Sequence, residues 1–238
     1  MKIRPSLSVV IPCYNEEGNV PLLVERLGQI TSQEPRIEFI LVNNGSRDNT
    51  GKFLSELASG KDNLTVINVA DNIGYGHGIK SGLRAATGDY VGWTHADLQT
   101  RPEDTLQALS IAESSRTPVF IKGVRHGRPK SDALLSLGMS LFESVLFGRL
   151  LKDINAQPTV FSKSFLPSVL MGPDDFGLDL YSMVEAKALG LIELRFPVHF
   201  GARFSGVSKW NTSAKARFRF ILRTLQYSLR LAANRGRN

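Results

Sequence analysis

Short apolar runs alternate with amphipathic segments through the first hundred residues of the chain. Runs rich in β-branched and aromatic side chains predict four strands, at residues 7–11, 37–42, 64–69 and 90–94. Apolar residues at helical spacing between these runs predict helices at about residues 19–30, 50–59 and 79–86. Strands that alternate with helices in this rhythm indicate a mostly parallel α/β sheet with right-handed crossovers.

The rest of the chain predicts three more strands and four more helices. The strands are expected at residues 119–124, 160–161 and 193–200, and the helices at 102–114, 132–151, 178–189 and 214–233. Segment 132–151 is apolar almost all the way round, yet it is too short and too interrupted to span a membrane. We expect this segment and the basic helix 214–233 either to lie in a membrane interface or to pack on each other, as a subdomain or a dimer contact.

The overall composition is ordinary for a soluble globular protein. At 238 residues the chain is long enough for one large domain, or for one domain with an appendage. Its single cysteine, Cys13, excludes an internal disulfide and fits a reducing compartment. The apolar run at residues 7–11 is too short for a signal peptide, so we expect a cytoplasmic location.

Charge is unevenly distributed along the chain. The formal net charge is +7, but the residues after Glu193 include ten Lys or Arg and no acid, so residues 1–193 sum to −3 (7 − 10). A basic tail calls for an anionic partner, and nucleic acid, anionic lipid and phosphate are the candidates. We expect no nucleic acid, because the tail contains no recognisable nucleic-acid-binding motif.

Polar turns follow three of the predicted strands. The first reads Pro12-x-Tyr14-Asn15-Glu16, the second Asn43-Asn44-Gly45-Ser46-x-Asp48, and the third His95-Ala96-Asp97-Leu98-Gln99. The carboxyl ends of parallel strands meet at one edge of a sheet, where open α/β sheets bind their ligands. In an extended chain, His95, Asp97 and Gln99 would project on the same side, as a ligand set for a metal or a phosphate.

These three motifs, in this order, resemble those of glycosyltransferase family 2, and most closely its polyprenol-phosphate (dolichol-phosphate-type) sugar transferases. The resemblance covers about residues 6–210 and continues through Gly123-x-Arg125, the loop at Asp153, Asp179 before Glu185-Ala186, and Arg203-x-x-Gly206-x-Ser208-Lys209. It implies the GT-A fold, an α/β architecture with a mixed, mostly parallel sheet flanked by helices and, here, a C-terminal amphipathic basic helix. We expect a glycosyltransferase domain at residues 1–203, and a basic loop and helix at residues 204–238.

The resemblance also implies an activity. It is that of an inverting glycosyltransferase that moves a sugar from a nucleoside-diphosphate sugar to a polyprenyl phosphate, undecaprenyl or dolichyl. Such an enzyme is expected in the cytoplasm, peripheral at the inner face of the membrane and in contact with anionic lipid, with a homo-oligomer as one option. One alternative is transfer to a lipid-linked or free glycan in cell-envelope polysaccharide assembly. Another is a non-catalytic nucleotide-sugar-binding protein, suggested by acids that the family has and this chain lacks.

The resemblance places the nucleotide-sugar donor on the turns that follow the strands. Asn15 and Glu16 suit ribose hydroxyls or base edges, whereas Asp48 fits donor binding and capping of the next helix equally well. The glycine-rich turn at residues 72–78 either cradles phosphate or is only a tight turn before a helix. The expected donor-binding residues are Pro12, Tyr14, Asn15, Glu16, Asn44, Ser46, Asp48, Gly74, His95, Ala96 and Asp97.

Two motifs depart from the family pattern. Asn43-Asn44 stands where the family usually has two aspartates, and because an amide both donates and accepts, it suits cytosine as well as uracil or guanine. His95-x-Asp97 stands where the family has Asp-x-Asp, which binds the divalent cation that neutralises the diphosphate leaving group. The resemblance makes Asp97 the principal ligand of Mn²⁺ or Mg²⁺, with Gln99 as a second ligand. His95 either ligates a softer ion such as Mn²⁺ or only hydrogen-bonds at the end of its strand.

The acceptor side carries the candidate base and the candidate phosphate-binding cations. By resemblance, Asp153 is the candidate catalytic base and Asp179 the second candidate. A phosphate acceptor is already a good nucleophile, so positioning is expected to matter more than proton removal. The residues expected to bind the donor diphosphate and the acceptor phosphate are Arg125, Arg203, Ser208 and Lys209.

Overall fold

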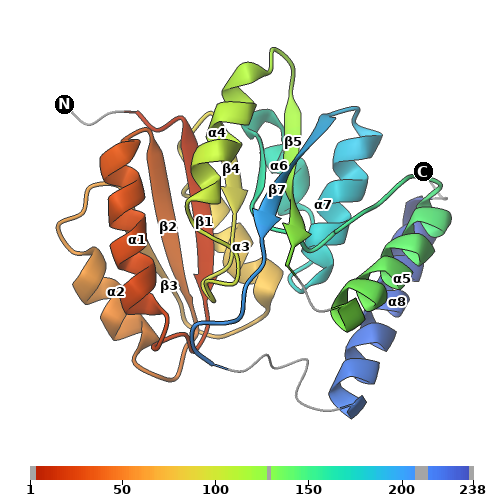
Figure 1. Cartoon of the computed structure of the whole chain (residues 1–238), viewed down its shortest axis with the longest axis horizontal. Helices are drawn as coiled ribbons and strands as arrows, with labels where there is room; N and C mark the ends of the chain where they lie inside the picture. Colours follow the sequence, from red (N-terminus) through yellow and green to blue (C-terminus); the bar gives the residue numbers. More distant parts are fainter. Residues whose placement is uncertain (1–3, 128–129, 207–213, 236–238) are drawn as a thin grey trace.

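The strands of the structure form one seven-stranded sheet in the order β3-β2-β1-β4-β6-β5-β7 (Figure 1). The computed structural model describes residues 4–127, 130–206 and 214–235. The strands are β1 (Leu7–Cys13), β2 (Ile37–Asn44), β3 (Leu64–Val69), β4 (Tyr90–Trp93), β5 (Val119–His126), β6 (Thr159–Ser162) and β7 (Ile192–His199). β6 runs antiparallel to β4 and β5, and the other paired strands are parallel. The sheet is therefore mixed and mostly parallel, as predicted.

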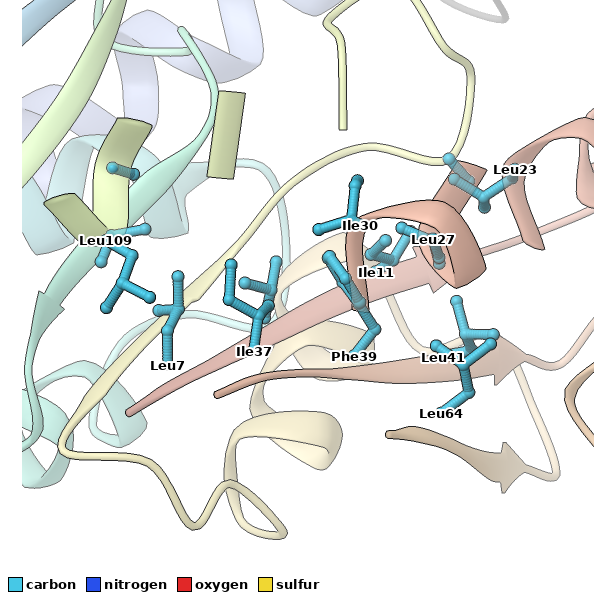
Figure 2. Close-up of a cluster of buried hydrophobic side chains, with 14 of the residues drawn as sticks. Leu7, Ile11, Leu23, Leu27, Ile30, Ile37, Phe39, Leu41, Leu64 and Leu109 are labelled. Atoms are coloured by element: carbon cyan, nitrogen blue, oxygen red, sulfur yellow. The ribbon is translucent and has the colours of Figure 1, made fainter. Parts of the chain in front are cut away.

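Helices cover both faces of this sheet. They are α1 (Val20–Gln33), α2 (Thr50–Ala58), α3 (Tyr75–Leu83), α4 (Asp104–Ser114), α5 (Lys130–Phe147), α6 (Leu166–Leu170), α7 (Gly177–Ala188) and α8 (Ala214–Arg235). Apolar side chains of α1, α2 and α4 pack on one face. Figure 2 shows part of this core, with Leu27 of α1 close to Ile11 of β1. Side chains of α3, α6 and α7 pack on the opposite face.

α3 begins earlier than predicted, at Tyr75 rather than near residue 79. The sequence predicts a turn there because glycine has a low helix propensity. In the structure, the glycines in the first turn of α3 permit close packing, since a Cβ at Gly76 would lie 2.4 Å from the Pro173 carbonyl oxygen and one at Gly78 would lie 2.7 Å from Asn44 Nδ2. This close packing therefore outweighs the propensity. The short helical segments η1 (Lys163–Phe165) and α6 were not predicted either.

The order of the strands reverses at β1, which pairs with β2 on one side and with β4 on the other. At such a switch point, open α/β sheets bind ligands outside the carboxyl ends of the strands. The turn after β1 and the turn after β4 carry the first and the third predicted motif. The fold therefore places both motifs at the edge where a ligand is expected.

α5 and α8 pack on each other, and α8 also packs on α7 (Figure 1). The Ser228 hydroxyl of α8 donates to Glu143 Oε1 of α5 at 3.1 Å. Tyr227 lies against Gly177 at the start of α7, where a Cβ would come within 2.6 Å of the tyrosine ring. Of the two alternatives for these helices, packing on each other is observed, and their place at a membrane interface stays a prediction. Within the residues that the structure describes, no helix combines the length and the hydropathy needed to cross a membrane.

Glu143 should make stability depend on pH. It is 3% exposed, and burial raises its pKa to about 7, although the hydrogen bond from Ser228 opposes the shift. The folded protein then keeps a proton that the unfolded chain releases near pH 4.5. As pH rises from the unfolded to the folded pKa, Glu143 should therefore lower the free energy of unfolding by roughly 3 kcal/mol.

Glu143→Gln, whose amide oxygen can still accept from Ser228, should remove this part of the pH dependence. Urea unfolding at about pH 5 and about pH 8 measures it. The exposed Glu56→Gln is the matched control, because it removes the same charge from a solvated position. An identical pH dependence in the wild type and in Glu143→Gln would contradict the prediction.

Candidate active site

Hydrogen bonds join the turn after β1 to the turn after β2. Asn15 has a left-handed backbone with φ of 55°, and its N–H donates to Ser46 Oγ at 3.1 Å. The Asn15 side-chain oxygen accepts from the Arg47 N–H at 2.9 Å, and the Glu16 N–H donates to Thr50 Oγ1 at 2.8 Å. Asparagine adopts this backbone conformation more readily than most residues. The first two motifs therefore form one unit, in which the Asn15 side chain stabilises the turn itself.

Asp48 closes the turn that begins α2. Its carboxylate accepts from the Thr50 N–H at 3.0 Å and from the Glu17 N–H at 3.3 Å. Partial burial opposes ionisation, but these hydrogen bonds outweigh it and lower the pKa of Asp48 below its usual value. Local structure thus accounts for Asp48, and its part in donor binding stays a prediction.

Asn43 and Asn44 are adjacent but differ in their surroundings. Asn43 is partly exposed, donates to Asn68 Oδ1 at 3.0 Å and accepts from the Ser46 N–H at 3.2 Å. Asn44 is 2% exposed, and its Nδ2 donates to the Gly74 carbonyl at 3.0 Å. Asn44, the predicted donor-binding residue, is therefore buried beside α3, whereas Asn43 keeps an exposed edge.

Three other predicted donor-binding residues lie in the sheet or next to it. Pro12 belongs to β1 and pairs in register with Val42 of β2. Tyr14 follows the strand and is partly buried. Ala96 is 3% exposed and packs in the core that contains α1 and α4. The Ala96 side chain is therefore not available to a ligand.

The glycine-rich segment around the start of α3 packs against the loop that precedes α7. A Cβ at Gly74 would lie 2.2 Å from the Asp174 carbonyl oxygen, and one at Gly76 would lie 2.4 Å from the Pro173 carbonyl oxygen. The Lys80 ammonium lies 2.9 Å from Asp174 Oδ1, and its hydrogen bond lowers the pKa of Asp174. These contacts explain the glycines without a ligand, so phosphate binding by this segment stays a prediction.

The acid of the third motif is paired with an arginine from near the end of the chain. Asp97 is 6% exposed, and its Oδ2 lies 2.9 Å from Arg203 Nη2. Its Oδ1 accepts from the Gln99 N–H at 3.1 Å, and the Gln99 side chain donates to the Gly201 carbonyl at 3.2 Å. The third motif and the segment after β7 therefore meet beyond the carboxyl end of β4.

The chain after β4 is not extended. Residues 96–100 form bends, and Leu98 has a left-handed φ of 57°. Alternation of side chains requires an extended backbone. The expectation that His95, Asp97 and Gln99 project together from an extended chain is therefore wrong, because the backbone turns between them.

His95 belongs to a stack of three rings. Its imidazole is stacked on the Tyr75 ring with centroids 5.6 Å apart, and Tyr75 is stacked on Phe176 at 4.8 Å. Burial lowers the pKa of His95, and the charges of Asp97 and Asp179 only partly offset this effect. The imidazole is therefore neutral at physiological pH, which is the form that ligates metal ions. Tyr75 and Phe176 were missed in the sequence, which marks them only as aromatic residues near glycines.

A fully buried ion pair lies next to this stack. Lys122 and Asp179 are 0% and 2% exposed, and the ammonium lies 3.1 Å from Asp179 Oδ1. Lys122 also donates to Thr159 Oγ1 at 2.8 Å, and the Gln157 amide donates to Asp179 at 3.0 Å. Burial and the nearby charge of Asp179 both raise the pKa of the Tyr75 hydroxyl. Asp179, the second candidate base, is thus the counter-ion of a buried lysine, and the missed signal was a lysine within an apolar strand.

The first candidate base, Asp153, is held by Arg125. Its Oδ2 accepts from the Arg125 backbone N–H at 2.7 Å, and its Oδ1 accepts from Arg125 Nε at 2.7 Å. The guanidinium also lies over the Phe200 ring, 5.4 Å from the centroid. Arg125 therefore engages both carboxylate oxygens. Ser208 and Lys209, the other predicted phosphate-binding residues, lie outside the residues that the structure describes.

Comparison with known proteins places this site in a family. The family model described as "Glycosyl transferase family 2" matches residues 8–154, more than half of the chain. The chain belongs to glycosyltransferase family 2. The matched residues contain all three turn motifs together with Arg125 and Asp153, whereas Asp179 and Arg203 lie beyond them.

Curated family 2 relatives match over part of the chain. An undecaprenyl-phosphate 4-deoxy-4-formamido-L-arabinose transferase of Proteus mirabilis is 41% identical over 109 residues, which are 45% of this chain and 33% of the relative. The transferase of the same description from Pectobacterium atrosepticum is 39% identical over 109 residues, with the same coverage. The matches thus span about a third of the length of these relatives.

Solved structures share the fold over most of the chain. Glucosyl-3-phosphoglycerate synthase from Mycobacterium tuberculosis, in complex with phosphoglyceric acid, has a TM-score of 0.74 at 17% identity and covers 96% of this chain and 80% of its own. A mannosyltransferase from Pyrobaculum calidifontis, in complex with GDP-Man and Mn²⁺, has a TM-score of 0.60 at 24% identity and covers 86% of this chain and 59% of its own. The predicted class, a family 2 glycosyltransferase with the GT-A fold, is confirmed by these matches together.

Three of the carboxylates predicted in this family 2 site are each paired with a cation. The pairs are Asp97–Arg203, Asp153–Arg125 and Asp179–Lys122. In the described part of the chain, no group of three or more His, Cys, Asp or Glu side chains is placed to hold a metal ion. The groups around Asp97 nevertheless suit a divalent cation, because carboxylate and amide oxygens are ligands that Mg²⁺ and Mn²⁺ prefer and an imidazole suits a softer ion.

Loss of one partner of the Lys122–Asp179 pair should destabilise the protein strongly. Asp179→Asn leaves a buried ammonium unpaired and Lys122→Met leaves a buried carboxylate unpaired, so each should lower the free energy of unfolding by about 3–5 kcal/mol. The double variant should lose clearly less than the sum of the two losses. Urea unfolding of the wild type, both single variants and the double variant measures this coupling.

The same experiment separates a structural Asp179 from a catalytic one. If Asp179→Asn leaves stability unchanged and abolishes turnover, Asp179 is the base and the structural assignment is wrong. Additive losses in the double variant would contradict the ion pair as a stabilising unit.

Proposed function

We propose that the protein is an inverting glycosyltransferase that moves a sugar from a nucleoside-diphosphate sugar to a polyprenyl phosphate such as undecaprenyl phosphate. The observation that carries the proposal is the meeting of Asp97 and Arg203, 2.9 Å apart, at the strand switch of a family 2 domain. An acid and an arginine at this edge suit a metal-bound diphosphate. The relatives named undecaprenyl-phosphate sugar transferases support the choice of acceptor.

On this proposal, Asp97 holds a divalent cation, Mn²⁺ or Mg²⁺, and Gln99 and His95 are further ligands that would reach it from a bent rather than an extended backbone. Solved neighbours that contain Mn²⁺ with GDP-Man or with uridine diphosphate support a divalent cation. When bound, the cation neutralises the charge that develops on the diphosphate leaving group. The turns that carry Asn15 and the partly exposed Asn43 lie at the same edge, where they can contact the nucleoside.

The acceptor phosphate needs positioning more than it needs a base, because it is already anionic and nucleophilic. Arg125 and Arg203 suit phosphate oxygens, since a guanidinium donates through a planar fork, and Ser208 and Lys209 would add to this set. Arg125 engages both oxygens of Asp153, so removal of a proton by this carboxylate would compete with the pairing. We therefore assign Asp153 to positioning Arg125.

The outer faces of α5 and α8 supply a surface that suits a membrane. The exposed apolar side chains are Leu137, Leu141 and Val145 on α5 and Phe218, Leu222 and Leu229 on α8. The exposed arginines of α8 include Arg219, Arg223 and Arg230. Apolar stripes flanked by arginines favour the interface of an anionic bilayer, with the apolar side chains among acyl chains. This surface would hold the enzyme at the inner face of the membrane, beside its lipid acceptor.

A non-catalytic nucleotide-sugar-binding protein is the second candidate. The observation that favours it is His95 in place of a family acid, next to an Asp97 whose two oxygens are both engaged. Transfer of sugar to undecaprenyl phosphate decides between the two, because only an enzyme yields glycosylated lipid.

Calorimetric titration with UDP, GDP and CDP, with and without Mn²⁺, tests the donor site. One of the three should bind at least about tenfold more tightly with Mn²⁺, because a cation held by Asp97 would offset the negative charge of the diphosphate. Asp97→Ala should remove this metal dependence. The exposed Asp62→Ala, which removes the same charge far from the motifs, should keep it. Binding of none of the three, or binding indifferent to metal and to Asp97, would contradict the proposed donor site.

Co-sedimentation with vesicles tests the membrane surface. The protein should bind vesicles that contain anionic lipid and bind neutral vesicles less, with affinity that falls as salt rises. Leu141→Gln and Val145→Gln should each weaken binding about tenfold, because each removes an apolar side chain worth about 1.5 kcal/mol or more when buried. Met171→Gln is the matched control, since Met171 is 81% exposed outside α5 and α8. Vesicle binding equal in all variants, or a stable dimer broken by Leu141→Gln, would contradict the assignment.

A further inference from the structure

We infer that Arg203 and a divalent cation compete for the carboxylate of Asp97, and that Arg203 moves to the donor diphosphate when the cation binds. The inference rests on the proposed function and adds to it an exchange of partners by one arginine. Arg203 is thus a binding residue with two anionic partners, used in turn. Binding of metal and binding of nucleotide become coupled, because each depends on which partner Arg203 has.

The geometry at Asp97 is unfavourable for two cations at once. Arg203 Nη2 lies 2.9 Å from Asp97 Oδ2, and Oδ1 accepts from the Gln99 N–H at 3.1 Å. A divalent cation binds a carboxylate oxygen at about 2.1 Å, which would bring it within about 5 Å of the guanidinium. Because Asp97 is only 6% exposed, water screens this repulsion poorly. The cation is therefore expected to displace the arginine.

The neighbouring basic side chains of the site are each paired with another carboxylate. Arg125 engages both oxygens of Asp153, and Lys122 lies 3.1 Å from the buried Asp179. Arg203 differs from both in the described part of the chain, because its anion is also the predicted metal ligand. An exchange of cations at this position thus moves Arg203 and leaves the other two pairs intact.

Arg203 lies on a segment that can shift without disrupting the sheet. Residues 200–206 follow β7 and contain neither helix nor strand. The segment is joined to the rest by bonds such as Gly201 N–H to the Gln99 carbonyl at 2.8 Å and Asn19 Nδ2 to the Ser205 carbonyl at 3.3 Å. Segments with few backbone hydrogen bonds open at low cost. A movement of Arg203 by a few ångströms therefore needs no change in the core.

The charge of the site gives the exchange a direction. An imidazole, His95, stands where the family has a second acid, so Arg203 alone neutralises the remaining carboxylate. A divalent cation added to this pair would leave excess positive charge beside it. A nucleoside diphosphate supplies the missing negative charge, and a guanidinium binds it through two donors. Cation and nucleotide are thus expected to bind together rather than separately.

Binding of Mn²⁺ in the absence of nucleotide is the decisive measurement, followed through the electron paramagnetic resonance of the free ion. Arg203→Gln should bind Mn²⁺ at least about tenfold more tightly than the wild type, because the competing cation is gone. Arg84→Gln, which removes an equal charge from an exposed position at the end of α3, should match the wild type. Equal or weaker Mn²⁺ binding by Arg203→Gln would overturn the inference.

Nucleotide binding without metal supplies an independent readout. In the presence of a chelator, Asp97→Asn should bind the preferred nucleoside diphosphate about threefold or more tightly than the wild type, because Arg203 is released from its carboxylate. The gain should vanish in Asp97→Asn/Arg203→Gln. A gain that survives in the double variant, or no gain at all, would contradict a role for Arg203.

These outcomes separate the inference from the function on which it rests. If the wild type binds no nucleotide with or without Mn²⁺, the proposed donor site is wrong. If it binds one with Mn²⁺ but Arg203→Gln shows no gain in affinity for Mn²⁺ alone, the donor site stands and the exchange is wrong.

Discussion

Burial of charge at the carboxyl edge of the sheet is the constraint on which the second half of the chain depends. The Lys122–Asp179 pair joins β5 to α7, and the contact of Arg125 with Asp153 joins the end of β5 to the loop before β6. The contact of Arg203 with Asp97 holds the segment after β7 next to the end of β4. An unpaired buried charge costs several kcal/mol, so each acid requires its cation in one place. The geometry of the candidate site is thus fixed by charge pairing as much as by the order of the strands.

The location of the three motifs at one edge of the sheet could be predicted from the sequence, because it depends on local signals. β-branched runs mark strands, and polar turns mark the places where they end, so the three motifs could be assigned to one edge before any contact was known. The start of α3 could not be predicted, because it depends on Gly76 and Gly78 packing against Pro173 and Asn44, which are distant in the sequence. The spacing of the glycines alone is compatible with a turn. Only the contacts that these glycines make in the folded protein show that the segment is helical.

Site residues could be placed in the site by resemblance, but their partners could not. The sequence put Asp97 and Arg203 in one pocket without indicating that they touch, since that contact depends on how the segment after β7 folds back. The left-handed backbone of Leu98 turns the chain after β4, so the prediction that His95, Asp97 and Gln99 project from an extended chain failed. Lys122 differs from these residues, because a lysine within an apolar strand indicates that an acidic partner is buried beside it. The sequence does not indicate which acid that partner is.

The departure at His95 and the contact of Arg203 with Asp97 are best understood together. In a site with two carboxylates, a divalent cation is neutralised by the protein, and the metal can bind before the nucleotide. With one carboxylate already matched by one guanidinium, the protein alone has no charge to spare for the cation. On the proposed function, the diphosphate would supply the balancing charge, and the arginine would donate to it through its planar fork. Replacement of one acid in this motif would then change the order in which charge is balanced, and it would transfer part of the metal's task to Arg203.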